Sequence, residues 1–111
     1  MVTIVETYLK ENIDEDITIK PWLKKGNIPI FLRDSYNFYE MTILGTQCVL
    51  LEVIAEMPSI DQLKKHLKQI KNLTNCQIVL FYKDITRYRR KSLIKNKISF
   101  VLNFIISSFI N

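Results

Sequence analysis

The stretch at residues 36 to 54 constrains the fold of this chain most strongly. It is rich in aromatic and β-branched residues, and Leu44-Gly45 interrupts it near the middle. This pattern predicts two strands joined by a two-residue turn. One face then carries Tyr36, Phe38, Glu40, Thr42, Gln47, Val49, Leu51 and Val53, and the other carries Asn37, Tyr39, Met41, Ile43, Thr46, Cys48, Leu50 and Glu52. Because both faces are largely apolar, we expect helices to cover the sheet on both sides.

Helices are predicted before and after this hairpin. Apolar residues at helical spacing predict one over residues 2 to 11. After Pro58, Ser59 and Gln62 fit a capping box that begins a second helix, whose apolar stripe consists of Ile60, Leu63, Leu67, Ile70 and Leu73. A third helix, capped by Asp84, is predicted to run to about residue 96, with Leu93 and Ile94 facing inward.

Short apolar runs at residues 77 to 82 and 98 to 102 predict two further strands, each preceded by a helix. Strand–helix–strand order predicts parallel neighbours with right-handed crossovers. We therefore expect a single α/β domain with a mixed sheet of about four strands, starting with the hairpin. Residues 1–27 would form an N-terminal helix and a connection, residues 28–102 the core, and residues 103–111 an irregular or truncated tail.

Charge is unevenly distributed along the chain. Residues 1–56 hold five basic and nine acidic side chains, whereas residues 57–111 hold eleven basic and two acidic ones. A basic half of this kind can bind nucleic acid, an acidic lipid surface or an acidic protein. It can equally be a helix surface that is simply exposed to solvent. Its dense tract predicts phosphate contacts from Arg87, Arg89, Arg90, Lys91 and Lys95. Tyr88 is a candidate either for stacking on a base or for packing against the sheet.

Most catalytic templates are excluded. The chain has two glycines and one histidine, with no nucleotide-binding or hydrolase motif, so no enzyme activity and no cofactor are expected. Cys48 and Cys76 lack metal-ligand spacing, which predicts buried free thiols in a reducing cytoplasm. His66 lies at the margin of an apolar stripe and is interpreted as a boundary residue. The apolar run at residues 98–111 is shorter than the roughly 20 residues of a membrane helix, so no membrane contact is expected.

Asp34 and Glu52 suggest an alternative function, in which two carboxylates bind a metal ion. The order helix, hairpin, helix and strand is similar to the restriction-endonuclease-like fold, in which an Asp and a Glu-x-Lys hold Mg²⁺. This resemblance implies Asp34 and Glu52 as the metal ligands. Ile54 stands where the lysine belongs, so it implies a catalytically degenerate relative of Mg²⁺-dependent nucleases.

A second resemblance extends over residues 28–101. Its segments are residues 28–32, 36–40, 50–52, 78–81, 88–94 and 98–101, with the lysine-rich helix around Leu67 and Ile70. Together these segments resemble the N-terminal region of bacterial proteins labelled MarR-like transcriptional regulators. The resemblance implies a non-enzymatic, cytoplasmic module of a DNA-associated regulator. In those proteins a winged-helix domain follows, whereas this chain ends in FIISSFIN, which predicts truncation before that domain. The remaining alternative is a stand-alone interaction domain that binds a protein partner or a second copy of itself.

Overall fold

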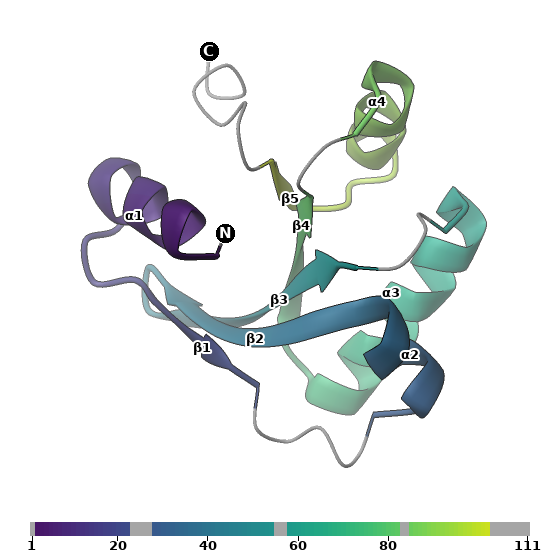
Figure 1. Ribbon diagram of the computed structural model, residues 1–111, viewed down its shortest axis with the longest axis horizontal. Coiled ribbons are helices and arrows are strands. Elements are labelled where there is room, and N and C mark those ends of the chain that lie inside the picture. Colours follow the sequence, from purple (N-terminus) through teal and green to yellow (C-terminus); the bar gives the residue numbers. More distant parts are fainter. Residues whose placement is uncertain (1, 23–27, 55–57, 83–84, 103–111) are drawn as a thin grey trace.

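The structure is a computed structural model that describes residues 2–22, 28–54, 58–82 and 85–102 (Figure 1). These residues form a five-stranded mixed sheet in the order β1-β2-β3-β4-β5. Its strands are β1 (Thr18–Pro21), β2 (Tyr36–Ile43), β3 (Thr46–Val53), β4 (Gln77–Tyr82) and β5 (Phe100–Leu102). The helices are α1 (Val2–Asn12), α2 (Ile30–Ser35), α3 (Ile60–Thr74) and α4 (Arg87–Lys95).

The predicted hairpin is confirmed in position and register. β2 and β3 pair antiparallel, from Tyr36 opposite Val53 to Ile43 opposite Thr46. Leu44 and Gly45 close the turn with φ angles of 50° and 76°, a left-handed pair that matches the twist of the strands. The Leu44 amide donates a hydrogen bond to Oδ2 of Asp14 at 2.6 Å. This bond helps to hold a non-glycine residue in a conformation that it would otherwise avoid.

The two parallel crossovers are also confirmed, and one strand is new. β3 pairs parallel with β4, and β4 pairs parallel with β5, so α3 and α4 each connect parallel neighbours. β1 adds an antiparallel edge strand beside β2. The sequence did not reveal it because it is four residues long and ends in Pro21, which limits it to an edge position.

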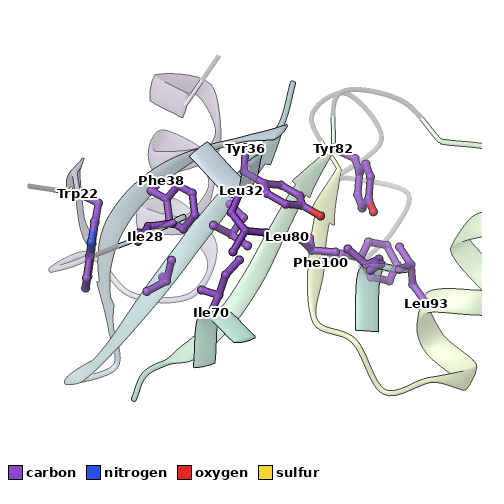
Figure 2. Close-up of a cluster of buried hydrophobic side chains, with 13 residues drawn as sticks. Trp22, Ile28, Leu32, Tyr36, Phe38, Ile70, Leu80, Tyr82, Leu93 and Phe100 are labelled. Carbon is purple, nitrogen blue, oxygen red and sulfur yellow. The ribbon is translucent and has the colours of Figure 1, made fainter. Parts of the chain in front are cut away.

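Helices cover both faces of the sheet, as predicted. Figure 1 shows α1 on one side, with α2 and α3 on the other. Side chains from α2, α3 and α4 join the cluster in Figure 2, which consists of Trp22, Ile28, Leu32, Tyr36, Phe38, Val49, Leu51, Leu63, Ile70, Leu80, Tyr82, Leu93 and Phe100. On the opposite face α1 packs through Leu9 against a cluster that also contains Ile17, Met41, Cys48, Leu50 and Phe81.

Two predicted core residues face solvent instead. Leu73 is 46% exposed and Ile94 is 59% exposed. Successive helical residues differ by about 100° around the axis, so Ile94 cannot share the fully buried direction of Leu93. Leu73 is similarly rotated away from the line of Leu63 and Ile70, toward one flank of α3.

Some predictions fall beyond these ranges. Asp84, the predicted cap of α4, and residues 103–111 lie outside the described residues. The N-cap of α4 is Thr86, whose hydroxyl oxygen accepts from the Arg89 amide at 3.1 Å. Within the described ranges, no helix is long and apolar enough to cross a membrane.

Candidate nucleic-acid interface

Helix α4 can carry many basic side chains because few of its positions are buried in the core. Leu93 is its buried residue, and the sequence RYRRKSLIK places cations at most other positions. Arg87, Lys91 and Lys95 are exposed, and so is Tyr88. The apolar contact of Leu93 therefore fixes the helix on the sheet while its outer surface remains charged.

A groove lies between α4 and the first turn of α3. It is an open hollow of about 450 Å³, lined by Ile60, Asp61, Tyr88, Lys91, Ser92, Lys95 and Asn96. Lys91 and Lys95 lie one turn apart and extend along one wall, with Tyr88 one turn before Lys91. The groove thus brings together two cations and an aromatic ring.

Three further lysines lie on the flank of α3 that borders this groove. Lys64, Lys68 and Lys71 are spaced by four and three residues, so they share one side of the helix with Ile60 and Asp61. All three side chains are exposed. His66 lies on the other flank, where its ring contacts Phe31 of α2. The cations of α3 therefore add to the positive charge on the α4 side.

None of these lysines forms an ion pair with a carboxylate in the part of the chain that the structure describes. The one ion pair in the described ranges joins Lys10 and Glu6, at 3.7 Å within α1. Asp61 borders the groove at the first turn of α3, where the helix dipole stabilises an acidic side chain. Lys91 and Lys95 line the groove together with this one carboxylate, and Lys64, Lys68 and Lys71 lie on the adjoining flank of α3. Positive charge is therefore in excess around the α3–α4 groove, which attracts polyanions.

Arg89 differs from the other basic residues of α4. It is half-buried, and its Nη1 atom is fully buried without a hydrogen-bond partner in the part of the chain that the structure describes. Tyr82 is 2% exposed, and its hydroxyl is likewise unpartnered among those residues. Burial raises the pKa of Tyr82 to about 12, and the nearby charge of Arg89 acts in the opposite direction. The Arg89 guanidinium thus lies near enough to the Tyr82 hydroxyl to influence its pKa.

The structure therefore separates the five predicted contact residues into groups. Lys91 and Lys95 line the groove, and Arg87 is exposed at the start of α4. Arg90 is half-buried, as is Arg89. The lysines of α3 were not among the predicted contact residues, although the spacing of Lys64, Lys68 and Lys71 predicts that they lie on one flank of the helix.

Asp34 and Glu52 do not share a face of the molecule. Glu52 lies on the α1 side of the sheet, where it accepts hydrogen bonds from Asn37 Nδ2 at 2.8 Å and from the Tyr39 hydroxyl at 3.4 Å. Asp34 belongs to α2, which packs on the other face through Leu32. No group of three or more His, Cys, Asp and Glu side chains that could hold a metal occurs among the described residues.

His66 and Tyr36 form a polar contact at the edge of the core. The Tyr36 hydroxyl lies 2.8 Å from His66 Nδ1, and the two rings meet edge to face. Burial lowers the pKa of His66. Burial, together with the nearby Tyr82, raises the pKa of Tyr36. The pair thus connects α3 to β2 in uncharged form at neutral pH, which agrees with the interpretation of His66 as a boundary residue.

Cys48 is buried and Cys76 is half-buried, and both are free thiols.

Among the described features, the α3–α4 groove is the strongest candidate for a binding site, because it combines exposed cations, an exposed aromatic ring and a hollow. Comparisons of the chain with protein-family models, curated proteins and solved structures find no match.

Proposed function

We propose that this chain is a non-enzymatic, nucleic-acid-binding module of a DNA-associated regulator. The observation that carries the proposal is the α3–α4 groove, where Lys91 and Lys95 lie beside an exposed tyrosine and form no ion pair with any described carboxylate. The resemblance of residues 28–101 to regulator N-terminal regions supports the link to DNA. No specific observation favours the metal-dependent nuclease, since Asp34 and Glu52 lie on opposite sides of the sheet.

Binding would be governed by phosphate charge. Each lysine that contacts a phosphate releases a condensed counterion, so affinity falls steeply as salt rises. Lysine contributes a mobile point charge rather than a planar fork, which favours contact with phosphates over reading of base edges. We therefore expect binding that is strongly salt-dependent and only weakly specific for sequence.

Fluorescence anisotropy with labelled DNA tests this proposal through two matched charge reversals. Lys91→Glu/Lys95→Glu changes the groove. Lys20→Glu/Arg33→Glu makes the same charge change on β1 and α2, where both side chains are exposed. At low salt we expect wild type and the control to bind similarly and the groove variant to lose at least tenfold in affinity. The slope of log affinity against log salt should also become shallower in the groove variant, by up to about 0.9 per lost phosphate contact.

Two results would overturn the proposal. One is the absence of DNA binding by the folded wild type at low salt, which would redirect attention to an acidic protein as the partner. The other is an equal loss of affinity in the two charge reversals, because net charge alone would then explain binding. Thermal unfolding of each variant verifies that the comparison is made between folded proteins.

A further inference from the structure

We infer that the α3–α4 groove binds single-stranded DNA in preference to duplex, with Tyr88 as the surface on which a base stacks. This inference rests on the proposed function and adds the form of nucleic acid that the groove accepts. Three features support it: the exposure of the Tyr88 ring, the cations beside it, and the size of the hollow.

Tyr88 does not contribute to the core. The residue is 82% exposed, although it belongs to a regular helix whose buried position is Leu93. The ring lines the groove together with Lys91 and Lys95, which follow it by one and two helical turns. An aromatic face next to a row of cations combines the two elements with which proteins hold unpaired strands, a stacking platform and a basic track for the backbone.

The size of the hollow favours an unpaired base over a duplex. A volume of about 450 Å³ lies in the range of small-molecule sites. A base that leaves the stack can enter such a space, whereas an intact duplex can only lie across its rim. In a duplex the base faces are covered by neighbouring base pairs, so Tyr88 could not stack on them.

The polar groups of the groove indicate tolerance of sequence. Asn96 Nδ2 donates one of its two hydrogens to the Ser92 carbonyl at 2.8 Å, so half of the donor capacity of this amide is used within α4. Lys91 and Lys95 carry charge rather than a fixed pattern of hydrogen bonds. Stacking on Tyr88 would therefore provide most of the preference for an unpaired strand, because every base has a π-face.

Anisotropy titrations of a mixed-sequence DNA oligonucleotide, alone and annealed to its complement, test the inference. Wild type should bind the single strand more tightly than the duplex at the same salt concentration. Tyr88→Ala should weaken single-strand binding about tenfold while leaving duplex binding and both salt slopes nearly unchanged, because no phosphate contact is lost. Tyr88→Phe keeps the ring and should retain wild-type affinity. Phe31→Ala removes an exposed ring of α2, outside the groove, and should not alter binding.

The outcomes separate this inference from the proposed function. Salt-sensitive binding of both forms of DNA, lost in Lys91→Glu/Lys95→Glu but unaffected by Tyr88→Ala, would overturn the stacking inference and keep the function. Equal or tighter binding of the duplex would overturn it as well. Failure of wild type to bind either form at low salt would remove both.

Discussion

At the scale of single residues, two buried tyrosines differ in how their hydroxyls are satisfied. The Tyr36 hydroxyl is hydrogen-bonded to His66 Nδ1 at 2.8 Å. The Tyr82 hydroxyl is buried and has no partner among the described residues. A hydrogen bond in a protein contributes about 1 kcal/mol net, whereas a buried group without a partner opposes folding through its lost hydration. The same substitution at the two positions should therefore have different effects.

We predict that Tyr36→Phe lowers the free energy of unfolding by about 1 kcal/mol. Tyr82→Phe removes an unpartnered hydroxyl and should leave stability unchanged or raise it slightly. Urea unfolding monitored by circular dichroism measures both differences directly. If Tyr82→Phe were as costly as Tyr36→Phe, the Tyr82 hydroxyl would have to be hydrogen-bonded in the folded protein.

At the scale of elements, α3 shows how much a local pattern can determine. Its N-terminus is set by a capping box in which Ser59 Oγ accepts from the Gln62 amide at 3.2 Å and Gln62 Oε1 accepts from the Ser59 amide at 3.3 Å. At its other end Asn75 takes a left-handed conformation, which asparagine tolerates well. Both ends depend on residues close in sequence, so the helix was predictable.

Ser59→Ala should reduce the free energy of unfolding by about 1 kcal/mol, because the cap of α3 loses its acceptor. Ser99→Ala is the matched control, since Ser99 is exposed and caps no helix. We expect the control to change stability by less than about 0.5 kcal/mol. Chemical denaturation compares the two variants, and an equal effect of both would contradict the role assigned to the capping box.

The features that the sequence did not predict depend on contacts between distant segments. The hairpin turn at Leu44-Gly45 and the capping box are encoded within a few residues. The groove, in contrast, exists because Leu63 and Leu93 pack on one face of the sheet and place α3 and α4 beside each other. The sequence analysis identified the basic tract of α4, but it could not show which of its side chains are accessible. Lys91 lines the groove, whereas the guanidinium of Arg89 is partly buried.

At the scale of the whole molecule, several acidic side chains form hydrogen bonds within the fold, whereas most basic side chains are exposed on its surface. Carboxylates of the N-terminal half hold the fold together: Glu6 accepts from the Ile19 amide, and Asp14 accepts from the amides of Asp16 and Leu44. The lysines of α3 and α4 form no ion pair within the described ranges. The charge asymmetry of the sequence thus becomes an asymmetry of the surface, with the available positive charge around the α3–α4 groove.

The most direct test is a titration of ¹⁵N-labelled protein with a short single-stranded DNA at low salt, followed by amide chemical shifts. We predict that the largest shifts occur in α4 and in the first turn of α3, that they disappear as salt is raised, and that α1 and β1 are unaffected. Shifts concentrated on α1 or β1, or no shifts at all, would contradict the assignment of the α3–α4 groove as a nucleic-acid interface.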